Sequence, residues 1–137
     1  MCLAVYLASN KPLPVIAWDE KAPAFYLEAI DEAEPVRAQF AYAHVYYAGS
    51  HEGCGCGFSK DGVADDEFEQ HQQNYVALGR TVRDALDHGA ELQIFTCWEG
   101  EQTNEPQSVL SVSPATLESP EYELQQLELL RVQETDA

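Results

Sequence analysis

The sequence predicts an α+β fold: a single domain over residues 1–137 in which one long amphipathic helix packs on a sheet. We expect about five or six strands in that sheet, in a mixed or mostly antiparallel arrangement. Three observations lead to this prediction. The chain has 137 residues, of which 45% are hydrophobic, and this suits one core. Residues 66–88 have helical periodicity, and several short apolar runs are separated by turn-forming residues.

The helix at 66–88 is indicated by a mostly apolar stripe of residues at helical spacing, which are Phe68, His71, Tyr75, Leu78, Val82 and Leu86. Asp65 or Asp66 is expected to cap its start, and Gly89 is expected to end it. His71 lies on the apolar stripe, so we expect it to be a hydrogen-bonded core residue.

The expected strands are short runs on both sides of this helix. Residues 2–8 are apolar on both alternating faces, which predicts a central strand. Further strands are expected at 24–30, 43–48, 91–98 and 108–113. The tail at 121–133 fits neither period well, and we favour a strand there. Short helical turns are expected at Pro35 and at 113–119.

The stretch VYYAGSHEGCGCGF, residues 45–58, crowds cysteines and glycines beside a histidine. We expect residues 43–48 and 54–58 to pair as an antiparallel hairpin around the loop GSHEG. In that register Tyr47 covers Gly55, because an aromatic ring compensates for the missing side chain of a strand glycine. His51 is expected to be exposed at the tip of the loop.

The opposite face of the expected hairpin holds the candidate site. There Cys54, Cys56 and His44 share one side, since alternate residues of a strand point the same way. Cys97, which ends a later strand, is the expected third cysteine, although Cys2 or a histidine could also complete the set. His51 is a further site candidate. Cysteine and histidine are typical zinc ligands, and the cofactor would be zinc or iron. The competing interpretation is that the cysteines are small core residues.

Charge excludes one class of partner. The chain has 24 Asp and Glu against 7 Lys and Arg, a net charge of −17, which disfavours binding to nucleic acid. A basic protein partner or a solvated surface remains open, and the oligomeric state is not predicted. No signal peptide or membrane span is visible, so we expect a cytoplasmic protein with reduced cysteines and no membrane contact.

Two classes of function remain. The first is a Cys and His site that binds a metal or carries out thiol chemistry, including nucleophilic catalysis by Cys54. The second is an acidic interaction module or structural protein without chemistry. Whether the chain is an enzyme stays open, since it contains no GxSxG, HExxH, phosphate-binding loop or dinucleotide fingerprint.

Overall fold

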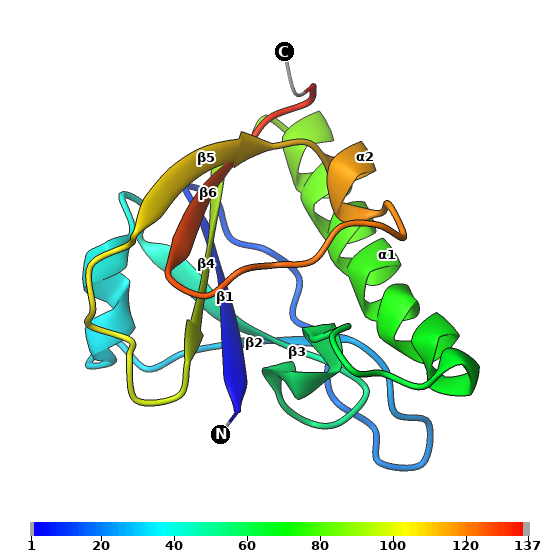
Figure 1. Cartoon of the computed structure of the whole chain (residues 1–137). Coiled ribbons are helices and arrows are strands. Elements are labelled where there is room, and N and C mark those ends of the chain that lie inside the picture. Colours follow the sequence, from blue (N-terminus) through cyan, green and yellow to red (C-terminus); the bar gives the residue numbers. More distant parts are fainter. Residues whose placement is uncertain (1, 136–137) are drawn as a thin grey trace.

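A computed structural model describes residues 2–135 and shows a six-stranded mixed sheet with the strand order β2-β3-β1-β4-β6-β5 (Figure 1). Its strands are β1 (Leu3–Ser9), β2 (Tyr26–Ala29), β3 (His44–Gly49), β4 (Leu92–Trp98), β5 (Ser108–Val112) and β6 (Glu128–Val132). Neighbouring strands are antiparallel except β5 and β6, which are parallel. The predicted α+β class is confirmed.

One face of the sheet is covered by α1 (Asp65–Asp87), which crosses it with the short helix α2 (Pro114–Leu117) beside it (Figure 1). The core on this side joins alternate residues of β1 to the buried stripe of α1. Its members include Leu3, Val5, Leu7, Leu27, Ala48, Phe58, Tyr75, Leu78, Val82, Ile94, Leu117 and Leu130. The predicted central strand is confirmed, because every residue of β1 is buried.

The other face of the sheet packs on the segment around the 3₁₀ helix η1 (Pro35–Gln39), which starts at Pro35 as expected. This smaller core contains Ala4, Tyr6, Val36, Phe95, Cys97 and Leu127. Alternation along β1 explains the division, since Ala4 and Tyr6 point away from α1 while their neighbours point toward it.

The predicted helix is confirmed with small changes. Its N-cap is Ala64, and no side chain caps it, so Asp65 lies in the first turn instead of at the cap. Acidic residues there still favour the helix because they face its positive end. Gly89 has a φ of +83°, the left-handed conformation that glycine adopts after a helix end.

The buried face of α1 is wider than the apolar stripe. Tyr75, Leu78 and Val82 are fully buried as predicted, but Phe68 and Leu86 are only partly buried. Polar and small residues are buried as well, namely His71, Gln72, Asn74, Gly79 and Ala85. The segment around α2 packs on this added surface, where the side chain of Glu118 approaches the position that a Gly79 side chain would occupy.

The predicted hairpin at 43–58 is wrong in its second half. Residues 43–48 contain β3, but Gly55–Phe58 form a 3₁₀ helix, η2, and do not pair with β3. The turn is organised by Ser50, whose hydroxyl donates to the Cys54 carbonyl at 2.6 Å and accepts from Gly57 N–H at 3.0 Å. A hydrogen-bonded turn therefore replaces the expected ladder.

The glycines of this turn allow close approach. A Cβ on Gly55 would lie 2.2 Å from the backbone oxygen of Leu3, and one on Gly57 would lie 2.3 Å from Ser50 Oγ. Tyr47 does contact Gly55, but through its hydroxyl, which accepts the Gly55 N–H at 3.0 Å. Gly55 thus allows η2 to pack against β1, and Gly57 allows η2 to lie close to Ser50 in the turn.

The tail forms β6 as favoured, and the expected helical turn is α2, capped by the Ser113 side chain. Across residues 2–135, no helix has both the length and the hydrophobicity needed to cross a lipid bilayer.

Candidate functional site

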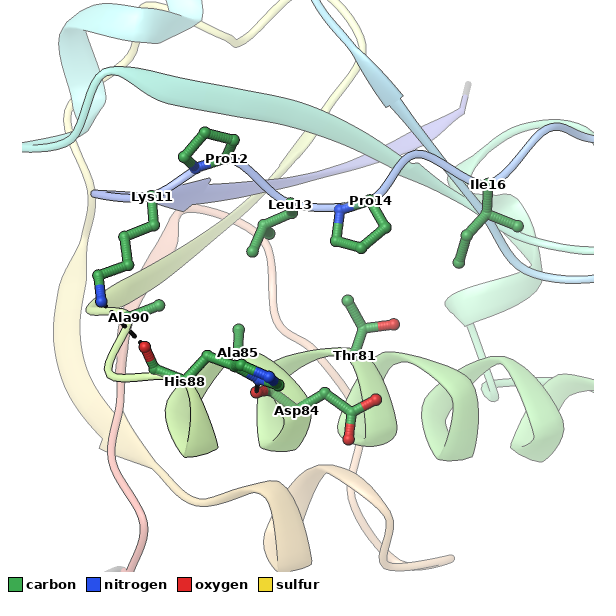
Figure 2. Close-up of a pocket in the computed structure, with 10 residues that line it drawn as sticks. All are labelled: Lys11, Pro12, Leu13, Pro14, Ile16, Thr81, Asp84, Ala85, His88 and Ala90. Carbon is green, nitrogen blue, oxygen red and sulfur yellow. Dashed lines mark hydrogen bonds between the residues drawn. The ribbon is translucent and has the colours of Figure 1, made fainter.

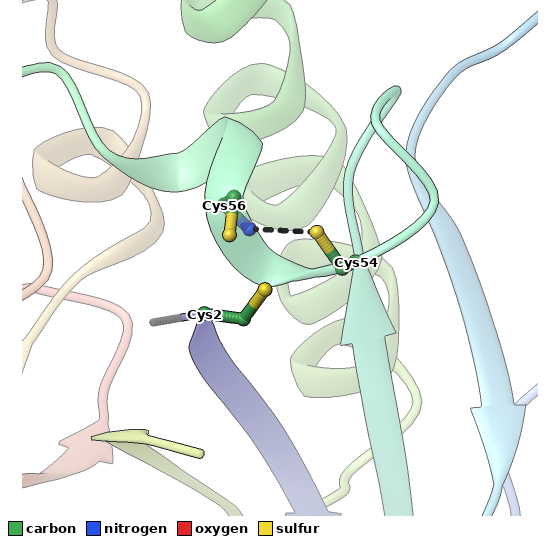
Figure 3. Close-up of side chains that lie close together, drawn as sticks. All are labelled: Cys2, Cys54 and Cys56. Carbon is green, nitrogen blue, oxygen red and sulfur yellow. Dashed lines mark hydrogen bonds between the residues drawn. The ribbon is translucent and has the colours of Figure 1, made fainter.

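Three thiols meet at one end of the sheet, where β1 starts and β3 ends (Figure 3). Cys2 directly precedes β1, Cys54 follows the turn after β3, and Cys56 lies in η2. Their Sγ atoms all lie within 4.8 Å of one another. Cys2 is exposed and the other two are partly buried, so the cluster is open to solvent.

Hydrogen bonds and charge link the three sulfurs of this thiol cluster to one another. The backbone N–H of Cys56 donates to Cys54 Sγ at 3.5 Å, and such a bond is strongest when the sulfur is a thiolate. The pKa of Cys2 is raised, first by its hydrogen bond with Cys56 and then by the charge of that same group. The raised pKa shows that a Cys2 thiolate is disfavoured beside a second charged sulfur, and a bound cation would relieve that repulsion.

The structure brings together two of the residues predicted for the site and separates the others. His44 pairs with Ser9 at the far end of β1, so the length of that strand lies between His44 and Cys2. Cys97 is fully buried on β4, on the sheet face that packs on η1. Burial, followed by Glu99 and Glu101, raises the pKa of Cys97 to about 12, which makes it an inert core thiol.

Cys2 was one of the residues that could complete the set, but Cys97 was preferred to it, although the sequence holds a signal that favours Cys2. The register pairs Val5 with Ala48 in antiparallel strands. Continuing that register beyond both strands brings the residue before β1 beside the turn after β3. Pairing the runs 2–8 and 43–48 would therefore have placed Cys2 next to the Cys54 turn.

A second group of possible ligands lies on the α1 side of the same turn. The group consists of His51, Glu52 and His71, each with one ligand atom within 4.8 Å of those of the other two. The centroids of the two imidazole rings are 5.0 Å apart in an edge-to-face arrangement. His71 is buried and its Nδ1 meets the Ser59 carbonyl at 2.8 Å, which confirms the expected hydrogen-bonded core residue.

His51 is half-buried instead of exposed at a loop tip. Its Nδ1 lies 2.9 Å from the side-chain amide nitrogen of Asn74 on α1. Burial, and then the neighbouring His71, lowers the pKa of His51, while Glu52 acts in the opposite direction. His51 is thus held neutral near physiological pH.

Two cavities lie along α1, beneath the irregular segment between β1 and β2. The first, of about 520 Å³, is bounded by residues 11–16 and the last turns of the helix, including Asp84 and His88 (Figure 2). Lys11 closes one end by donating to the His88 carbonyl at 2.9 Å. The second, of about 530 Å³, shares Ile16 and Thr81 with the first and reaches His51.

Comparison of the chain with protein-family models found no match, and comparisons with curated proteins and with solved structures found none either. The function is therefore argued from the thiol cluster and the cavities.

Proposed function

We propose that this protein binds a zinc ion through Cys2, Cys54 and Cys56. The observation that carries the proposal is the convergence of three Sγ atoms within 4.8 Å at a solvent-accessible position. Free cysteine is among the most frequently buried residue types, and Cys97 follows that rule. Three cysteines that break the rule at the same place support a site for a soft metal ion.

The spacing of the thiols suits zinc. Zinc–sulfur bonds of about 2.3 Å in a tetrahedron put ligand sulfurs about 3.8 Å apart. The sulfurs of the cluster already lie within 4.8 Å, so small side-chain rotations suffice to close the site. The backbone N–H at Cys54 Sγ would orient that ligand and support its charge, as second-shell donors do in metal sites.

The number of thiols favours zinc over iron. Iron–sulfur clusters are usually held by four cysteines, whereas the described residues bring three together. Three protein ligands leave one tetrahedral position for water or another molecule, the arrangement of open zinc sites. We expect the site to be filled in a reducing compartment, where thiols stay free.

The test is metal analysis of protein purified without chelator, followed by cobalt substitution to detect thiolate-to-metal absorption. We expect stoichiometric zinc, lost in Cys2→Ala and in the double variant Cys54→Ser, Cys56→Ser. Cys97→Ala is the matched control, since it removes a cysteine buried on the other sheet face, and it should retain zinc.

Thiol labelling of the metal-free protein gives a second measurement. Cys2, Cys54 and Cys56 should react with a thiol reagent under native conditions, and Cys97 only after unfolding. Failure to bind zinc or cobalt would contradict the proposal, and so would equal loss of metal in Cys97→Ala. A disulfide between Cys2 and Cys56, formed on exposure to a small disulfide oxidant without metal binding, would assign the cluster to thiol redox chemistry instead.

A further inference from the structure

The cavity that reaches His51, called here the His51 cavity, differs in charge from the rest of the molecule. The chain carries 24 Asp and Glu against 7 Lys and Arg. Among the described residues that line this cavity, however, the one charged side chain is Arg80. Its wall combines apolar groups from Ile16, Phe25 and Ala77 with polar groups on α1.

Arg80 is available for a ligand. Within residues 2–135 its guanidinium has no hydrogen bond or ion pair, and the residue is exposed on α1. Other cations are already engaged: Arg37 donates to three backbone carbonyls, and Arg83 pairs with Glu118 at 2.9 Å. An unpaired guanidinium beside an apolar wall offers a forked donor for a carboxylate.

The hydrogen bonds of Asn74 determine which His51 nitrogen carries the proton. Asn74 Oδ1 accepts from the His51 backbone N–H at 3.1 Å, and its Nδ2 donates to the Gly57 carbonyl at 3.1 Å. This fixes the amide orientation, so Nδ2 must also donate to His51 Nδ1. Neutral His51 therefore carries its proton on Nε2 and offers a donor there.

The same tautomer disfavours a metal at His51, Glu52 and His71. A metal ligand needs an unprotonated ring nitrogen, and the unprotonated Nδ1 of His51 is already occupied by Asn74. His51, which lines the cavity, thus offers a hydrogen-bond donor and not a metal ligand.

From these observations we propose that the His51 cavity binds a small carboxylate with an apolar body, its carboxylate held by Arg80 and His51. The apolar body would lie against Ile16, Phe25 and Ala77. The volume of about 530 Å³ falls in the range of small-molecule sites. One guanidinium and one imidazole N–H suit a monoanion, whereas a phosphate would require more donors. This inference does not depend on the zinc site.

The experiment is an NMR titration with 3-phenylpropanoate, compared with its neutral amide and with inorganic phosphate. We expect the carboxylate to shift the His51 ring signals and to bind about tenfold more tightly than either comparison probe. Arg80→Gln should weaken binding of the carboxylate about tenfold. Arg83→Gln is the matched control, because it removes the same charge three residues away on a face paired with Glu118, and it should leave the affinity unchanged.

Equal binding of the amide would overturn the proposal, since it would show an apolar cavity without carboxylate recognition. Equal binding of phosphate, or equal weakening by Arg80→Gln and Arg83→Gln, would also overturn it, because the attraction would then be general charge. Cys2→Ala separates the two proposals: loss of zinc with unchanged 3-phenylpropanoate affinity is expected, and loss of both would contradict an independent cavity.

Discussion

At the scale of single residues, Glu128 is a carboxylate in an unfavourable place. It is 8% exposed at the start of β6 and lies opposite Thr96, whose buried hydroxyl has no hydrogen-bond partner among the described residues. Burial raises the pKa of Glu128 above its ordinary value, and a hydrogen bond from the Gln125 backbone only partly offsets this. The charged form is therefore less stable in the folded protein than in the unfolded chain.

This pKa shift has a definite sign for stability. Between the unfolded and folded pKa values the folded state binds more protons, so the free energy of unfolding falls as pH rises through that window. Glu128→Gln should therefore stabilise the protein at pH 7, and the gain should shrink toward about pH 3, which lies below the ordinary glutamate pKa so that both states are protonated. Urea unfolding of the unchanged protein and of Glu128→Gln, at the higher and at the lower pH, measures this gain in the free energy of unfolding.

Glu105→Gln is the control, since it removes the same charge from an exposed position. An equal gain from Glu105→Gln would attribute the effect to net charge instead of to burial at Glu128.

Residue types in the sequence indicated the Cys54 site only in part. The closeness of Cys54 and Cys56 could be anticipated from their spacing, but the 3₁₀ turn that carries them was not, and the third thiol depends on strand register. Cys97 was a reasonable candidate by residue type alone, yet alternation along β4 turns it to the η1 side of the sheet. Which face a strand residue occupies is decided by tertiary packing, not by its own chemistry.

At the scale of elements, α1 is held by its central buried residues. Leu78 is fully buried within the larger core. Leu78→Ala should lower the free energy of unfolding by about 2 to 5 kcal/mol, because it removes buried methyl groups and leaves a cavity. Leu110→Ala on β5 is the control: that side chain is 52% exposed, and its loss should cost less than about 1 kcal/mol.

Chemical denaturation of both variants makes the comparison. A loss below about 0.5 kcal/mol for Leu78→Ala would show that α1 does not use this face.

The elements that could be predicted are those whose pattern is long or strongly alternating. The periodicity of α1 extends over many turns and agreed with the structure, and β1 was evident from its continuous apolar run. The run CGCGF alternates like a strand, but it folds as η2. The contacts that favour η2 are made with Ser50 and Leu3, which lie outside the run, so its own alternation does not reveal them. The tail fitted neither period because Leu127, at a φ of +54°, turns the chain just before β6 and packs on the face opposite to Leu130.

At the scale of the whole molecule, the charge balance opposes folding. The net charge is −17, and several of the few cations serve local structure. Lys60 is an example: its ammonium donates to Gln72 and to the Tyr122 carbonyl at 2.6 Å each and lies over the Tyr75 ring. Such cations anchor the 59–61 segment and α1 but do little to neutralise the acidic surface, so self-repulsion among exposed carboxylates remains.

Added salt should therefore stabilise the isolated protein. The screening length falls from about 30 Å at 0.01 M to about 3 Å at 1 M ionic strength, so repulsion between exposed acids weakens while the buried core is unaffected. We expect the urea midpoint to rise between these two sodium chloride concentrations, with sodium chloride chosen because sulfate would also strengthen apolar burial. A midpoint that is independent of salt would mean that the carboxylates are too far apart to repel one another. Self-repulsion on a solvated surface would then have no measurable effect on stability. The better explanation of the acidic composition would be a basic protein partner, which salt should release in a pull-down experiment.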